Sequence, residues 1–135
     1  MNSIKIALLG LGNVGSGVWE ILDKHHDRIS KCIGAPIEVK KVLVRDIHKK
    51  RKISVPSNIF TVSFSDIIND PEIQIVVELM GGLTPAYEYI KMAIENGKSV
   101  VTANKAVISH YGRELLELAR HKNIELRFEG SVGGG

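Results

Sequence analysis

The 135-residue chain has little of what secreted, membrane or nucleic-acid-binding proteins usually carry. It has one cysteine, Cys32, which excludes a disulfide framework and indicates a reduced, buried thiol. No stretch approaches the roughly 20 apolar residues of a membrane-spanning helix, and a strand pattern that begins at residue 4 leaves no room for a signal peptide. The formal net charge of +3 is too small to indicate nucleic acid or a membrane surface as a partner. These absences predict a cytoplasmic protein without either partner.

What is present is typical of a single globular domain, with 44% apolar and 24% charged residues. Apolar and β-branched runs predict six strands, at residues 4–9, 37–44, 59–63, 73–80, 98–103 and 124–129. Helical patterns lie between them: from Val14 to Gly34, over 65–70, from a Thr84 cap and Pro85 to Asn96 and Gly97, and over 104–123. This alternation predicts an α/β fold with a doubly wound parallel sheet in the dinucleotide-binding order 3-2-1-4-5-6.

The first strand is followed by the motif G-x-G-x-x-G, formed by Gly10, Gly12 and Gly15. Gly10 permits a tight turn, Gly12 lets a pyrophosphate approach the backbone, and Gly15 allows close packing of helix and strand. The amides of Asn13 and Val14 then point at the phosphates from the positive end of the helix. Because the motif follows a buried strand and opens an amphipathic helix, it predicts dinucleotide binding rather than a purely structural turn.

The second strand ends in "VRD", which offers both signs of charge to the adenosine half of a dinucleotide. Arg45 is suited to stacking on adenine or to binding a 2′-phosphate, whereas Asp46 is suited to the ribose hydroxyls. The alternative is that residues 45–52 form a solvated loop. Arg45 lies 30 residues after Gly15 (45 − 15), further along than the usual spacing of about 20. We expect Arg45 near the adenosine.

Ligands of such sheets bind outside the carboxyl ends of the strands, which directs attention to three further segments. Gly81 and Gly82 follow the fourth strand and suit a chain that passes close to a ribose, or a plain loop. Lys105 follows the fifth strand and suits a carboxylate or a developing alkoxide near the nicotinamide, or simple solvation on a helix. Glu129 follows the last strand and is suited to a metal ion, together with backbone carbonyls, or to solvent.

Taken together, the motifs resemble those of the homoserine dehydrogenases. "IALLGLGNVGSGV", "VLVRD", "VVELMGG", "VVTANKAVIS" and "FEGSVGGG" occur in the family's order over the whole chain. The resemblance implies NAD(P)-dependent interconversion of L-homoserine and L-aspartate 4-semialdehyde, on the route to threonine, methionine and isoleucine. It implies dinucleotide binding by Leu11 to Val14 and Arg45, and Thr102 and Lys105 facing the nicotinamide and substrate, with Lys105 as the candidate catalytic group. It also implies a monovalent cation, Na+ or K+, on Glu129 and the carbonyls of Val132 and Gly134.

The resemblance also bears on domain organisation. Residues 1–135 correspond to the family's NAD(P)-binding domain, and the catalytic and dimerisation domain that follows in the family is absent from this chain. The implied full-length protein is a homodimer that acts on a small-molecule substrate, and the 135 residues alone are expected to be inactive. Two alternatives stay open from the sequence: the cofactor domain of another amino-acid or semialdehyde dehydrogenase, and a dinucleotide-sensing module without catalysis.

Overall fold

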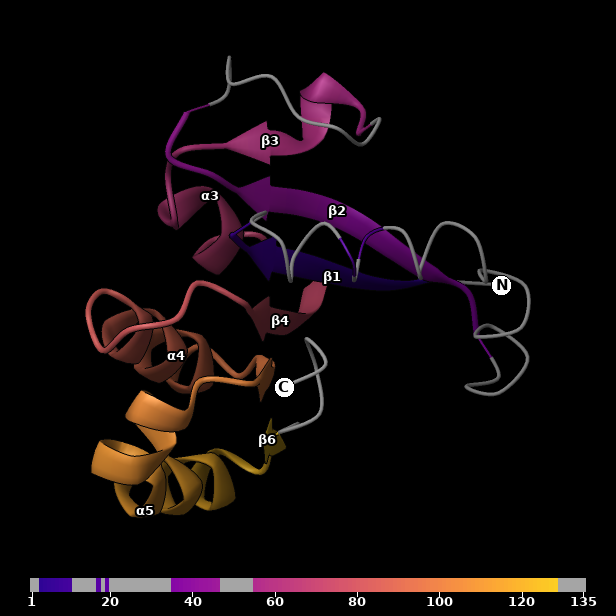
Figure 1. Ribbon diagram of the computed structural model, residues 1–135. Coiled ribbons are helices and arrows are strands. Elements are labelled where there is room, and N and C mark those ends of the chain that lie inside the picture. Colours follow the sequence, from indigo (N-terminus) through magenta and orange to yellow (C-terminus); the bar gives the residue numbers. More distant parts are fainter. Residues whose placement is uncertain (1–2, 11–16, 18, 20–34, 47–54, 129–135) are drawn as a thin grey trace.

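A six-stranded parallel sheet forms the centre of the computed structural model, which describes residues 3–10, 17, 19, 35–46 and 55–128. The strand order is β3-β2-β1-β4-β5-β6, as the sequence predicts (Figure 1). The strands are β1 (Ile4–Leu9), β2 (Ile37–Leu43), β3 (Phe60–Thr61), β4 (Ile73–Glu78), β5 (Ser99–Thr102) and β6 (Leu126–Phe128). The predicted doubly wound α/β architecture of the dinucleotide-binding type is therefore confirmed.

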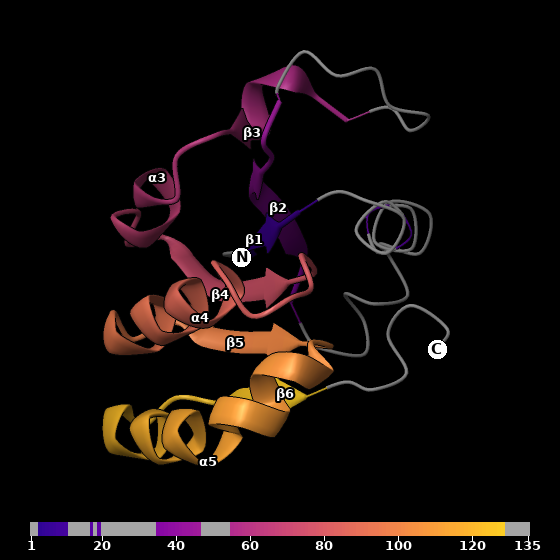
Figure 2. The same cartoon turned by 60° about the vertical axis from the view of Figure 1, so that its left-hand side comes forward.

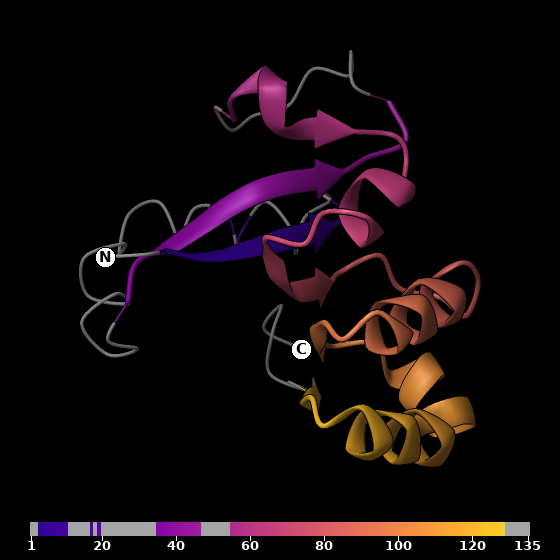
Figure 3. The same ribbon diagram turned by 180° about the vertical axis from the view of Figure 1, so that it is seen from behind.

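Three helices lie against one face of this sheet (Figure 2). They are α3 (Ser65–Ile68), α4 (Ala86–Glu95) and α5 (Lys105–Lys122), and a short 3-10 helix, η1 (Ser57–Ile59), precedes β3. Helices α4 and α5 pack side by side (Figure 3). The rings of Tyr87 and Tyr111 stack between them. The predicted helix over 14–34 lies outside the described residues except for Gly17 and Trp19, whose backbones are helical.

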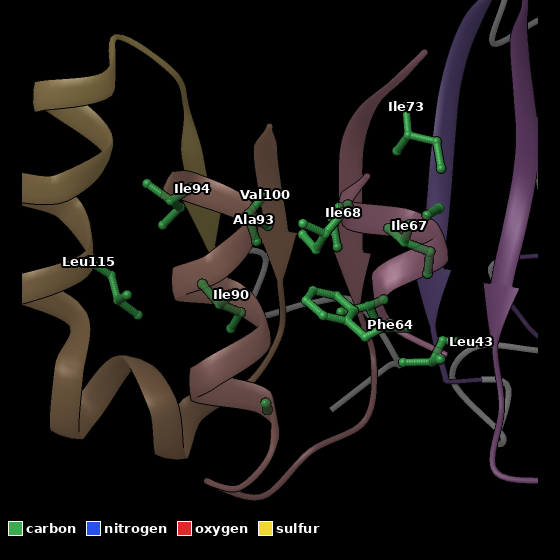
Figure 4. Close-up of a cluster of buried hydrophobic side chains, with 14 of the residues drawn as sticks. Leu43, Phe64, Ile67, Ile68, Ile73, Ile90, Ala93, Ile94, Val100 and Leu115 are labelled. Carbon is green, nitrogen blue, oxygen red and sulfur yellow. The ribbon is translucent and has the colours of Figure 1, made fainter. Parts of the chain in front are cut away.

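The hydrophobic core lies on both faces of the sheet, and β1 contributes side chains to both sides. Successive side chains of a strand point to opposite faces, so Ala7 and Leu9 pack toward the three helices while Ile6 and Leu8 pack on the other side. In Figure 4 the larger cluster fills the space between sheet and helices; its members include Leu43, Phe64, Ile67, Ile90, Val100 and Leu115. A continuous apolar run is what a central strand of a covered parallel sheet requires.

Two sequence predictions about local structure are wrong. Helix α4 begins at Ala86 with Pro85 at the N-cap and without a side-chain cap, so Thr84 does not cap it. Proline has no side-chain acceptor for a backbone amide, which leaves this cap position unfilled. The third strand has two residues rather than five, because the hydroxyl of Thr61 accepts from Ser63 N (3.1 Å) and donates to Asp66 Oδ2 (2.6 Å), turning the chain toward α3.

The other predicted boundaries that fall in the described residues agree with the structure to within two residues. Helix α4 ends at the predicted pair, with Asn96 as C-cap and Gly97 at a positive φ of 76°. Helix α5 follows Asn104, whose side chain caps it by accepting a hydrogen bond from Val107 N at 3.1 Å. The last strand starts at Leu126, two residues after the predicted start.

At the amino ends of β4 and β5, opposite the edge where a ligand is expected, lysines join the loop before β4 to the sheet. Lys98 is 4% exposed, and its Nζ donates to the carbonyls of Asp70 (2.7 Å) and Ile73 (2.8 Å). Burial lowers the pKa of Lys98. At the surface, Lys40 Nζ lies 2.6 Å from a carboxylate oxygen of both Asp70 and Glu72.

This ion-pair cluster predicts a loss of stability in acid. The hydrogen bond from Lys40 lowers the pKa of Asp70 below its ordinary value of 3.8 and lowers that of Glu72 as well. A carboxyl whose folded pKa is depressed stabilises the fold above its unfolded pKa, and this contribution is lost as the pH falls through the folded pKa. We expect the urea midpoint to fall as the pH drops below about 4, and Asp70→Asn to flatten that decline. Lys40→Met is expected to do the same; a wild-type pH profile in both variants would contradict the assignment.

Candidate functional site

The candidate site lies along the carboxyl ends of β1, β2, β4 and β5, where the chain reverses its order of strands. Gly10 leaves β1 with a φ of 100°, and its amide donates to the carbonyl of Leu43 at the end of β2 (2.9 Å). A Cβ at Gly10 would lie 3.2 Å from Met80 Cγ and 3.5 Å from Met80 Cα. Both the backbone conformation and the close approach of the segment after β4 therefore require glycine at this turn.

Much of the sequence-predicted site lies outside the described residues. This applies to the phosphate-binding segment Leu11, Gly12, Asn13, Val14 and Gly15, and to the cation ligands Glu129, Val132 and Gly134. Gly10, Arg45, Gly81, Thr102 and Lys105 are described, and all five follow or end strands at the same edge of the sheet. These five residues frame the edge on both sides of the β1 turn.

On one side of the turn, the chain beyond β2 presents its charged pair to solvent. Val44 continues past the strand and donates from its amide to the carbonyl of Thr61 (2.9 Å), which holds the end of β2 against β3. Arg45 and Asp46 follow, and both are exposed. Arg45 therefore lies two residues beyond Leu43, whose carbonyl accepts the hydrogen bond from the amide of Gly10.

On the other side of the turn, a fully buried carboxylate ends β4. Glu78 is 0% exposed, and its Oε2 accepts hydrogen bonds from the amides of Met80 (2.8 Å) and Gly81 (3.1 Å). Its Oε1 accepts from the hydroxyl of Thr102 on the neighbouring strand at 2.5 Å. The Thr102 oxygen in turn accepts from the amide of Asn104 (3.0 Å). Because a buried carboxylate must be hydrogen-bonded to be tolerated, this set of contacts meets the requirement within the chain.

The loop after β4 is open toward solvent and tied down at its far end. Gly81 and Gly82 have φ values of 78° and 72°, and a Cβ on either would meet no atom of the described residues within 4 Å. The side-chain amide of Asn104 donates to the carbonyl of Gly82 (2.7 Å), while its Oδ1 caps α5. The loop is thereby fixed against the first turn of α5, and its exposed backbone has room beside it for a ligand.

Thr102 and Lys105 occupy different environments at this edge. Thr102 is 1% exposed and commits its hydroxyl hydrogen to Glu78, so its side chain faces the interior. Lys105 is exposed at the first position of α5, and no acidic residue lies in that first turn. A cation is disfavoured at a helix N-terminus by the helix dipole. The position of Lys105 therefore adds positive charge where the helix already attracts anions.

Sequence reasoning missed the Glu78 network and the Asn104 bridge to Gly82. The sequence offered only a weak indication of them, namely an acidic residue at the end of an apolar strand, followed by two glycines. Within the described residues, no group of three or more histidine, cysteine, aspartate or glutamate side chains is arranged to hold a metal ion. A search of the same residues finds no helix with the length and apolarity to cross a membrane.

Comparison with known proteins agrees with this geometry. Residues 10–129 match the family model described as "Homoserine dehydrogenase, NAD binding domain". The homoserine dehydrogenase of Bacillus subtilis is 42% identical over 135 residues, which are 100% of this chain and 31% of that protein. The Synechocystis enzyme is 49% identical over 133 residues, 98% of this chain and 30% of that protein. A crystal structure of Staphylococcus aureus homoserine dehydrogenase superposes with a TM-score of 0.89 at 38% identity, covering 97% of this chain and 34% of that one.

Proposed function

The chain belongs to the homoserine dehydrogenase family, as its NAD-binding domain, and we propose that it binds NAD(H) or NADP(H) across the carboxyl ends of β1, β2, β4 and β5. The observation that carries the proposal is the glycine-only turn at Gly10, which lies where the strand order reverses between β1 and β4. Open α/β sheets bind dinucleotides at this switch point. The family match favours this assignment over another amino-acid or semialdehyde dehydrogenase.

The strand order supports a proposed place for each part of the cofactor. Because β1 lies between β2 and β4, a pyrophosphate bound at the Gly10 turn that follows β1 would have Arg45 on one side and Gly81 on the other. We assign the adenosine to the Arg45 side and the nicotinamide ribose to the Gly81 side. The exposed backbone of the glycine pair supports this direction, because a ribose can approach a loop without side chains.

Lys105 is the residue that we assign to the substrate. The chain spans about 30% of the length of its curated relatives. For the whole protein we propose interconversion of L-homoserine and L-aspartate 4-semialdehyde, with the bound nicotinamide supplying or receiving the hydride. The Lys105 ammonium, at the positive end of α5, is suited to binding the substrate carboxylate or the oxygen that gains negative charge during reduction.

Further parts of the proposal concern the whole protein. We propose that Glu129 and the carbonyls of Val132 and Gly134 bind Na+ or K+, because hard cations take oxygen ligands. The part of the relatives that this chain does not match would supply the remaining pocket and a homodimer interface. A single cysteine suits a reducing compartment, and we assign the protein to the cytoplasm.

Binding of the cofactor can be tested directly by calorimetric titration of the 135-residue chain with NADH and NADPH. We expect one of them to bind, and Gly12→Val to weaken binding at least about tenfold, because a side chain would occupy the place of the pyrophosphate. Gly17→Ala is the control, since a Cβ at Gly17 would meet no atom within 4 Å among the residues that the structure describes, and this variant should bind as the wild type does. Unchanged affinity in a folded Gly12→Val variant would contradict the proposal.

The choice between NADP and NAD depends on how Arg45 contacts the adenosine. If its guanidinium binds the 2′-phosphate, the charge-assisted contact is worth roughly 1.5–3 kcal/mol, or about ten- to a hundred-fold in affinity. Arg45→Ala should then weaken NADP binding far more than NAD binding, and added salt should narrow the difference because the side chain is exposed. Equal losses for both cofactors would instead indicate stacking on adenine. If Asp46 holds the ribose hydroxyls, NADP binds poorly from the start and Asp46→Ala improves it.

A further inference from the structure

Glu78 is an unusual residue for the middle of a sheet. It pairs with Leu9 of β1 on one side and with Thr102 of β5 on the other, so it ends a central strand at the switch point. Its side chain is fully buried, and transferring a carboxylate from water into a protein interior is unfavourable unless its oxygens are hydrogen-bonded. An apolar residue at this position would fill the same core without that cost. Packing alone therefore does not explain why this position holds a carboxylate.

We propose that Glu78 is a positioning residue for the nicotinamide half of the cofactor, acting through the Met80–Gly81 backbone and through Thr102. This inference rests on the proposed cofactor binding and deepens it. Glu78 itself would not touch the cofactor, because its side chain is completely covered by the chain. It holds the two surfaces that would touch one: the loop after β4 and the segment that leads from β5 into α5.

The loop after β4 supplies the first argument. Two consecutive glycines give residues 81 and 82 more backbone freedom than other residues have, and ordering such a segment upon binding would reduce affinity. Here the loop is already fixed at both ends, by Glu78 on the amides of Met80 and Gly81 and by Asn104 on the carbonyl of Gly82. The free chain thus holds the loop in one conformation, with its outer side open.

The direction of the hydrogen bonds supplies the second argument. The Asn104 amide donates to the Thr102 oxygen, and the Thr102 hydroxyl donates to Glu78. Both oxygens of a carboxylate accept, so Glu78 can receive this hydroxyl on Oε1 and the two loop amides on Oε2. A glutamine in its place has one accepting oxygen and would present N–H groups to one of these partners. The chain of hydrogen bonds from the Asn104 backbone amide through Thr102 to residue 78 therefore depends on a carboxylate at that position. Asn104 also caps α5, the helix that begins with Lys105.

The test compares NADH with ADP, which lacks both the nicotinamide and its ribose, or NADPH with 2′-phospho-ADP if the chain prefers NADP(H). In the wild-type chain the nicotinamide and its ribose should add affinity. In Glu78→Gln and in Thr102→Val, we expect that added affinity to fall by about tenfold while the affinity for the shorter ligand stays constant. Thr102→Val also carries the test if the glutamine variant fails to fold.

Thr61→Val is the matched control. Thr61 is 5% exposed and likewise donates to an acid, Asp66, while accepting from a backbone amide, that of Ser63. It lies at the β3 edge, away from β4 and β5, so its variant should keep the wild-type ratio of the two affinities. An unchanged ratio in folded Glu78→Gln and Thr102→Val, or equal losses for both ligands, would overturn the positioning role. Failure of the wild type to bind either ligand would instead overturn the proposed function itself.

Discussion

Gly10→Val should destabilise the fold by about 2–4 kcal/mol, a large part of the stability of a domain of this size. Gly10 has a φ of 100°, a conformation that costs a residue with a Cβ roughly 1–3 kcal/mol and that is least accessible to a β-branched residue. The added Cβ would also lie 3.2 Å from Met80 Cγ and 3.5 Å from Met80 Cα. The side chain of Met80 can move away, but its backbone is held by Glu78.

Urea unfolding of the wild type and the variant measures this effect, and the melting temperature should fall by roughly 4 °C for each kcal/mol. Gly17→Val serves as the control, because this glycine is exposed, has a helical backbone, and has no atom of the described part of the chain within 4 Å of an added Cβ. Glycine is a poor helix former, so the control should be as stable as the wild type or slightly more stable. If Gly10→Val unfolds at the wild-type midpoint, the turn does not require glycine.

The 135-residue chain should bind cofactor and yet show no measurable reduction of L-aspartate 4-semialdehyde. It matches 31% of the Bacillus subtilis enzyme, and Lys105 is the one side chain that we assign to the substrate. Holding reactants in the correct geometry is worth effective concentrations of about 10⁵–10⁸ M, and one exposed lysine cannot provide such a pocket. We expect a deficit of at least about 10⁵-fold in kcat/KM.

The assay follows NADPH or NADH absorbance with the semialdehyde present, and the full-length Bacillus subtilis enzyme serves as the positive control. Titration of the same sample with cofactor shows whether the chain is folded and competent to bind. Turnover by the purified 135-residue chain at a rate near that of the control would mean that the chain holds a complete substrate pocket.

The sheet was predictable because its signal is local. Residues 6–9 are apolar without alternation, as a strand covered on both faces must be, and they form the buried part of β1 (Ile4–Leu9). The strand order followed from the alternation of strands and helices. The third strand was overestimated, because a threonine that turns toward Asp66 looks, in sequence, like one more β-branched strand residue.

The candidate site was predictable only in part. The requirement for glycine at position 10 is a local backbone property, and the G-x-G-x-x-G motif predicts it. The role of Glu78 depends on its register with Thr102, which lies 24 residues further along the chain. Nothing in either segment alone indicates that a hydroxyl and a carboxylate will meet there. The burial of Lys98 under the carbonyls of Asp70 and Ile73 depends in the same way on tertiary contacts.

The central place of β1 has a consequence for synthesis on the ribosome. β1 can pair with β2 once Leu43 has emerged, but its other edge has no partner until β4 begins at Ile73. Translation of the 29 residues from 44 to 72 takes about 1 to 6 seconds at 5–20 residues per second. During that interval the nascent chain exposes the open edge of its most apolar strand, which is a template for pairing with other chains. A ribosome that stalls after it has synthesised β2 and before it has synthesised β4 would therefore hold an aggregation-prone nascent chain, which a chaperone could bind.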